Sequence, residues 1–174
     1  TCGAGGANAC LVPEQVEALQ RIHAGPSNSA GEQLYSDWAW DRGIASGDWR
    51  FWKLESGIPP GDGMPLIATM GASSLAQIFS TPPVDVEGTP AALEQYLLDF
   101  DFDTDVSVDA SDATFAESPM EFMTPTDVNN PELAAFRDAG GKMIVFHGMS
   151  DPVFSALDTI DWYEKLDANN GGDA

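Results

Sequence analysis

Apolar residues recur at helical spacing in several stretches, each bounded by residues that start or stop helices. The clearest begins at Pro13, places Val16, Leu19 and His23 on one face, and ends at the Gly-Pro pair 25–26. Proline suits the first position of a helix, and glycine suits the position just past its end. The same reasoning predicts further helices near 73–79 and over 90–98, 131–139 and 155–166.

A continuous apolar run breaks this periodicity near the carboxyl end. Residues 142–147 are typical of a strand buried on both faces. The helix before it, 131–139, is expected to turn Leu133 and Phe136 inward. The helix after it carries an apolar stripe of Leu157, Ile160, Tyr163 and Leu166. A helix, strand, loop and helix in this order form one unit of an α/β sheet.

The middle of the chain lacks a regular pattern. Residues 26–68 are rich in Gly, Ser, Asp and Pro, and they hold Trp38, Trp40, Trp49 and Trp52. A long irregular stretch is usually a lid or a binding insertion, and tryptophans supply its apolar mass.

An acidic alternation over 99–105 allows two interpretations. Its Asp spacing is that of a calcium loop, but an EF-hand needs Gly at the sixth position and Glu at the twelfth. Counted from Asp99, those positions hold Thr104 and Ala110. The pattern therefore favours a solvated turn over a calcium site, and we expect no metal ligands here.

Charge narrows the possible partners. The 174 residues include 28 Asp+Glu and 7 Lys+Arg, a net charge of −21. Such a surface repels phosphate backbones, which excludes nucleic acid as an expected partner. No run of about 18 apolar residues occurs, so no membrane-spanning segment is expected. The apolar fraction of 43% suits a globular protein with a core.

The two cysteines, Cys2 and Cys10, are close in sequence. A disulfide between them would indicate an oxidising compartment, and the protein would then be secreted or periplasmic. Reduced thiols or a metal pair are the alternatives, although no His/Cys cluster lies near them.

Asp151 follows the predicted strand, where functional residues gather in α/β sheets. Hydrolases place the acid of a Ser-His-Asp triad on such a loop, in the chain order Ser, Asp, His. From the spacing alone, an Asp at this position is more often a turn residue or a helix cap than a catalytic acid.

Two blocks resemble the tannase/feruloyl esterase family. Residues 129–133 and 140–155 (NNPEL and GGKMIVFHGMSDPVFS), continued by 158–164 (DTIDWYE), look like its acid-bearing block. Residues 10–16 and 22–26 (CLVPEQV and IHAGP) resemble the stretch that opens the second part of its lid. Val12 departs from the family, which usually has a hydroxyl residue there. The acid block and the 99–105 stretch look most like the MHETase-like branch.

The resemblance implies that Asp151 is the triad acid. The family's nucleophile lies in a Cys-Ser-x-Gly-Gly turn that this chain lacks, and its histidine follows the acid. His23 and His147 both precede Asp151, so His147 is expected to be a structural neighbour and His23 a packing or surface residue. The nucleophile and the histidine are expected upstream and downstream of this sequence.

The resemblance also implies binding roles. Phe154, Trp52 and Met70 match positions around the aromatic acyl group, and Cys2 and Cys10 match a lid disulfide. No cofactor is expected in this chain, whereas a structural Ca²⁺ is expected in the upstream part of the lid. The MHETase-like branch holds a substrate carboxylate with a lid arginine, and Leu66 stands at that place. A neutral or phenolic ester is therefore favoured over a terephthalate mono-ester.

Together these inferences predict a piece of an α/β-hydrolase, with lid over 1–125 and core over 126–174. The expected protein is a secreted serine carboxylesterase acting on esters of aromatic acids. Its expected partners are a small aromatic ester and the remaining portion of the same enzyme, and this chain alone is expected to be inactive. An inactive fragment that only binds aromatic ligands or partners is the alternative.

Overall fold

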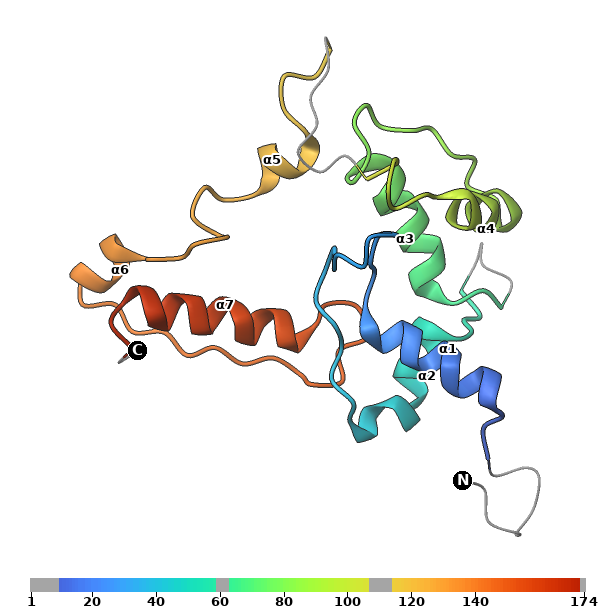
Figure 1. The fold of residues 1–174 in the computed structure, drawn as a ribbon, viewed down its shortest axis with the longest axis horizontal. Coiled ribbons are helices and arrows are strands. Elements are labelled where there is room, and N and C mark those ends of the chain that lie inside the picture. The colour runs from blue at the N-terminus through green and yellow to red at the C-terminus, as the bar shows by residue number, and fades with distance from the viewer. Residues whose placement is uncertain (1–9, 59–62, 107–113, 173–174) are drawn as a thin grey trace.

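The computed structural model describes residues 10–58, 63–106 and 114–172. Its helices are α1 (Pro13–Ala24), η1 (Arg42–Ala45), α2 (Gly47–Lys53), α3 (Leu66–Gln77), α4 (Pro90–Asp99), α5 (Pro119–Met123), α6 (Ala134–Asp138) and α7 (Ala156–Asn169). Helices α1–α4 gather at one side, while α7 lies at the other with the extended segment that precedes it (Figure 1). Within the described ranges, the one β-pairing is an isolated antiparallel bridge between Ser27 and Gln33.

Two predicted helices are confirmed close to their expected bounds. Helix α1 has Pro13 at its first position and ends at Gly25, whose φ of 76° favours glycine. Helix α4 begins after Thr89, whose hydroxyl accepts a hydrogen bond from the Ala92 amide at 3.3 Å.

Helix α3 is longer than predicted. It begins at Leu66, directly after Pro65, rather than near residue 73. Helix α4 packs against it. Ala72, Ala76 and Leu93 are buried at this contact, with exposed fractions of 0%, 1% and 3%. Small side chains on α3 let the two helices approach closely.

The stretch 26–68 is less irregular than predicted, because it holds η1 and α2. Ser46 begins α2 by accepting a hydrogen bond from the Trp49 amide at 3.1 Å. This turn buries Trp49, which is 5% exposed. The capping serine was the local signal that the sequence interpretation missed.

The carboxyl-terminal unit departs most from prediction. Residues 142–147 form no strand, and Ile144 and Phe146 are 90% and 92% exposed. The predicted burial on both faces is wrong for this chain, because the described residues contain no strand to pair with this run. Ile160 and Tyr163 of the predicted stripe are also 44% and 37% exposed, so of that stripe only Leu166 is fully buried.

The helix predicted over 131–139 is reduced to α6. Leu133 has a left-handed φ of 48°, which delays the helix until Ala134. Phe136 is 45% exposed rather than turned inward. Its ring lies over Gly141, where an added Cβ would come within 2.6 Å of it.

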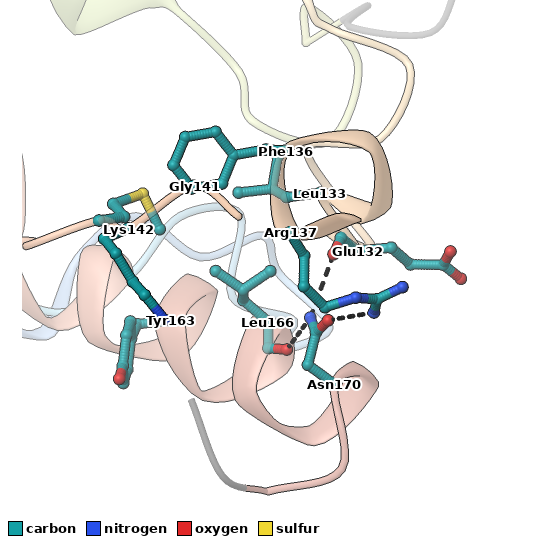
Figure 2. Close-up of a pocket in the computed structure, with 10 residues that line it drawn as sticks. Glu132, Leu133, Phe136, Arg137, Gly141, Lys142, Tyr163, Leu166 and Asn170 are labelled. Atoms are coloured by element: carbon teal, nitrogen blue, oxygen red, sulfur yellow. Dashed lines mark hydrogen bonds between the residues drawn. The ribbon is translucent and has the colours of Figure 1, made fainter. Parts of the chain in front are cut away.

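Helix α7 is held to the α6 region at its carboxyl end. Arg137 Nη1 donates to Asn170 Oδ1 at 2.6 Å, and Asn170 Nδ2 donates to the carbonyls of Glu132 and Leu166 at 3.1 and 2.8 Å (Figure 2). The residues that form these bonds also line a cavity of about 320 Å³ between α6 and α7.

Three other predictions concern the acidic run, the cysteine pair and membrane-spanning segments. The acidic run 101–105 forms a turn in which the Asp103 amide donates to Asp101 and the Asp101 amide donates to Asp105, as a solvated turn would. Cys2 lies outside the described residues, so its pairing with Cys10 stays a prediction. None of the described helices is both long and apolar enough to cross a bilayer.

At the other end of α7, Gly43 makes a close contact between segments distant in sequence. A Cβ added there would lie 2.0 Å from Ser150 Oγ and 2.2 Å from Ser150 Cβ. We expect Gly43→Ala to lower the free energy of unfolding by about 1–3 kcal/mol, because the added methyl overpacks this contact. Urea unfolding measures the change.

Gly47→Ala is the matched control, since nothing lies within 4 Å of its added Cβ. Equal stability of the two variants would contradict the contact between Gly43 and Ser150.

Candidate active site

Asp151 lies on the loop that leads into α7, and the loop backbone fixes its carboxylate. Its Oδ1 accepts hydrogen bonds from the amides of Val153 and Phe154 at 2.8 and 2.9 Å. Its own amide donates to the Gly148 carbonyl at 3.0 Å. Ser155 then begins α7 by accepting from the Leu157 amide at 3.1 Å. One carboxylate oxygen is therefore held by backbone donors, and the other faces away from them.

The second oxygen, Oδ2, lies 3.5 Å from His147 Nε2. The other ring nitrogen, Nδ1, is 2.7 Å from Thr159 Oγ1 on the second turn of α7. The imidazole thus bridges the acid loop and the helix. His147 is a structural neighbour of Asp151, as the sequence interpretation expected.

The pKa of Asp151 is lower than its ordinary value. Burial raises it, but the Val153 and Phe154 amides and the His147 ring together outweigh burial. Hydrogen bonds to a carboxylate favour its charged form. Asp151 is therefore ionised at neutral pH, as an acid that stabilises an imidazolium must be.

A segment of the predicted lid docks on this loop. The Ser155 amide donates to Tyr35 Oη at 3.2 Å, and the Ser155 hydroxyl donates to the Asp37 carbonyl. The Ser150 hydroxyl donates to Asp41, whose other carboxylate oxygen accepts from the Gly43 amide at 2.9 Å. The loop 148–155 is thus held by contacts on both sides of Asp151.

The charge of Asp151 affects the pKa of two side chains of the predicted lid, Lys53 and Tyr35. Burial lowers the pKa of Lys53, and the negative charge of Asp151 partly offsets this. Burial raises the pKa of Tyr35, and the Asp158 and Asp151 charges add to it against the Ser155 hydrogen bond. Sequence reasoning missed Tyr35, Lys53 and Thr159, because no motif links residues so far apart in the chain.

The three residues expected to bind substrate lie in different surroundings. Phe154 adjoins Asp151 through its amide, and its side chain is 66% exposed. Trp52 is half-buried on α2 beside Phe51, with ring centroids 6.1 Å apart. Met70 is 51% exposed on α3, which packs against α2. In the described part of the chain, no hydrogen bond or ring contact joins Trp52 or Met70 to Asp151, so their roles stay predictions.

His23 is a packing residue. It is 4% exposed, and its ring stacks on Trp40 and Trp49 at centroid distances of 3.9 and 5.9 Å. Its Nδ1 lies 3.3 Å from the Trp38 carbonyl. His23 therefore packs between a buried Trp49 and a largely exposed Trp40 at the end of α1.

The described ranges contain no group of three or more His, Cys, Asp or Glu residues placed to hold a metal ion. The Ca²⁺ expected by resemblance belongs to the upstream part of the lid, and it stays a prediction.

Oδ1 of Asp151 accepts from the amides two and three positions ahead, which is the pattern of an Asx turn, so this geometry fits a turn residue as well as a triad acid. The model of the family described as tannase and feruloyl esterase matches residues 1–174. The chain belongs to this family, whose fold is of the α/β-hydrolase type.

Three similar proteins carry esterase or hydrolase names. The chain is 43% identical over 172 residues to a mono(2-hydroxyethyl) terephthalate hydrolase of Piscinibacter sakaiensis, covering 95% of this chain and 28% of that protein. It is 29% identical over 166 residues to an uncharacterized esterase of Xanthomonas campestris pv. campestris, covering 95% and 26%. Feruloyl esterase B of Aspergillus niger is 40% identical over 37 residues, 21% of this chain and 7% of that protein. The chain spans little more than a quarter of the first two relatives.

The lowered pKa of Asp151 predicts a pH dependence of stability. Its ionised form stabilises folding above the unfolded pKa of about 3.9. That stabilisation is lost as pH falls through this value toward the folded pKa. Asp151→Asn keeps an oxygen acceptor for the two amides but does not titrate. We therefore expect the free energy of unfolding to fall less between about pH 6 and pH 3 in this variant than in the wild type.

Chemical denaturation at a series of pH values measures this difference. Asp127→Asn removes one exposed carboxyl without a hydrogen-bond partner in the described chain, and it serves as the charge-matched control. Identical pH profiles for wild type and Asp151→Asn would contradict the described hydrogen bonds.

Proposed function

We propose that this chain is part of a serine carboxylesterase that hydrolyses esters of aromatic acids, and that Asp151 is its triad acid. The observation that carries the proposal is the position of Asp151 on the loop that leads into α7, where the Val153 and Phe154 amides and the His147 ring favour its charged form. The family and the hydrolase names of the relatives support it.

Asp151 would accept a hydrogen bond from the catalytic imidazole, fix its tautomer and stabilise the cation that forms. That imidazole takes the serine proton as the serine oxygen attacks the ester carbonyl, and then gives it to the leaving alcohol. The acyl-enzyme is cleared by water. Backbone amides stabilise the oxyanion of each tetrahedral intermediate.

The serine and the catalytic histidine come from other portions of the enzyme in this proposal. His147 does not suit the role, because its Nε2 faces Asp151 and its Nδ1 faces Thr159. In a triad the Nδ1 side faces the acid, and Nε2 faces the nucleophile. His147 instead holds the acid loop against α7.

The exposed apolar face near α7 fits the same proposal. Ile144 and Phe146 lie on the extended run, and Ile160 lies on the facing side of α7, around a groove of about 550 Å³. Strands of the remaining portion would pair with residues 142–147 and cover this face, forming the α/β sheet.

In this proposal, the substrate has no free carboxylate that would need a binding partner at the start of α3. Leu66, the first residue of that helix, has no charge to pair with one. A neutral or phenolic aromatic ester is therefore preferred to a terephthalate mono-ester. Secretion, the Cys2–Cys10 disulfide and an upstream structural Ca²⁺ complete the proposal.

In the complete enzyme, we expect Asp151→Asn to lower kcat by about 10⁴-fold, since the imidazole loses its orienting charge. Asp127→Asn is the control and should leave kcat unchanged, because that carboxyl lies on an exposed turn. Hydrolysis of a p-nitrophenyl ester measures both. Full activity of Asp151→Asn would refute the assignment of the acid.

The alternative is an inactive module that binds aromatic ligands. It predicts no turnover even when a complementary portion is present, whereas the esterase proposal predicts turnover that depends on Asp151.

The proposed acyl-group contacts have their own test. Trp52→Ala and Phe154→Ala should each raise KM for an aromatic ester by up to about tenfold, because aromatic contacts contribute about 0.5–1.5 kcal/mol. Phe122→Ala, at a side chain 77% exposed on α5, is the control. An unchanged KM in both variants would remove these residues from the binding site.

A further inference from the structure

A second cavity lies away from Asp151, where the end of α1 meets α2 and α3. Its volume is about 720 Å³, and its walls include Arg21 and Ile22 of α1, Trp38, Lys53 of α2, Ile67 of α3 and Phe102. Trp52, Met70, Phe154 and Asp151 are not among its lining residues. The cavity thus has a lining of its own, although the charge of Asp151 acts on Lys53 in its wall.

The charge of this cavity is opposite to that of the chain. Arg21 and Lys53 are two of only 7 basic residues, and among the described residues no Asp or Glu lines the cavity. The ion pairs of the described residues use Arg50, Arg137, His147 and Lys165, and none of them involves Arg21 or Lys53. The cavity thus presents two cations that form no ion pair within the described chain, although the more distant charge of Asp151 acts on Lys53.

The Lys53 ammonium, one of the two cations in the cavity wall, is held in place by an aromatic ring. Its Nζ lies 4.6 Å from the centroid of the Trp38 ring, in a cation–π contact. Such a contact fixes the ammonium but does not neutralise it. The side chain is half-buried, so water screens its charge less than it screens an exposed lysine.

The carbonyls at the end of α1 are already occupied. The His23 carbonyl accepts from the Trp38 amide at 2.8 Å, and the Ala24 carbonyl accepts from Gln33 Nε2 at 3.1 Å. These two acceptors have donors of their own, and the ion pairs of the described residues do not involve Arg21, whose guanidinium can pair with an incoming anion.

The remaining walls suit an apolar body. Trp38, Phe102, Ile22 and Ile67 supply aromatic and aliphatic surface. The indole N–H of Trp38 is buried without a hydrogen-bond acceptor among the described residues. A buried donor without an acceptor costs about 1–3 kcal/mol, and a ligand oxygen is the group it lacks.

We propose that this cavity binds a small aromatic carboxylate, with its anionic group between Arg21 and Lys53 and its ring against Trp38 and Phe102. A polyanion is disfavoured, because the net charge of −21 repels it from the rest of the surface. The inference is independent of esterase activity, since it concerns binding to residues that the proposed reaction does not use.

Calorimetric titration of the 174-residue chain with benzoate, and with the neutral isostere benzamide, tests the proposal. We expect benzoate to bind at least tenfold more tightly than benzamide. In the Arg21→Gln/Lys53→Met variant, benzoate affinity should fall at least tenfold. Arg50→Gln is the control and should bind as the wild type does, because Arg50 pairs with Glu55 outside the cavity.

The indole N–H signal of Trp38, assigned with Trp38→Phe, reports the place of binding in NMR spectra. Benzoate should shift it, and the Arg21→Gln/Lys53→Met variant should lose the shift. Equal affinity for benzamide, no benzoate binding at millimolar concentration, or an unmoved Trp38 signal would each overturn the proposal. The benzamide comparison and the indole signal need no charge variant, so they decide the matter even if that variant fails to fold.

Discussion

The position of the acid depends on hydrogen bonds between the loop 148–155 and the segment 35–43. Tyr35 and the Asp37 carbonyl hold Ser155, and Asp41 holds Ser150. Each such bond contributes only about 0.5–1.5 kcal/mol to the stability of the fold, but together they hold the loop in place on both sides of Asp151. The partners are more than 100 positions apart in sequence. The geometry of the carboxylate is therefore a property of the folded chain, although its chemistry belongs to one residue.

Local contacts hold one oxygen of the Asp151 carboxylate, and the His147 ring connects the other oxygen to α7. The Val153 and Phe154 amides fix Oδ1, and this local turn forms within four residues. The His147 ring then joins the turn to Thr159 on α7. A carboxylate held in this way stays charged, with Oδ1 facing two amides and Oδ2 facing the His147 ring. The same Asp151 charge acts on Lys53 and Tyr35, so residues of the predicted lid share the electrostatic surroundings of the loop 148–155.

The apolar surface around α7 has a different physical origin. Ile144 and Phe146 are almost fully exposed, although the apolar run 142–147 that contains them predicts a buried strand. Burial of such a run needs neighbouring strands on both sides, and a sheet is formed by several segments together. In a family whose fold is of the α/β-hydrolase type, an apolar face of this kind is where we propose that further strands of the enzyme pack.

The sequence by itself determined the elements with local signals, and it indicated Asp151 as the acid that we propose. Pro13 with Gly25, and Thr89 with Pro90, set α1 and α4 because capping is decided by neighbouring residues. The block around Asp151 likewise indicated the family before any fold was known. Tertiary structure alone decided what surrounds that carboxylate and which apolar residues are covered. It brought Tyr35 to the loop 148–155, Thr159 to His147, and Lys53 within reach of the Asp151 charge. It also placed Arg21 and Lys53 in the wall of one cavity and left Phe146 exposed. These outcomes depend on segments distant in the chain, and no spacing within one segment encodes which of them will meet.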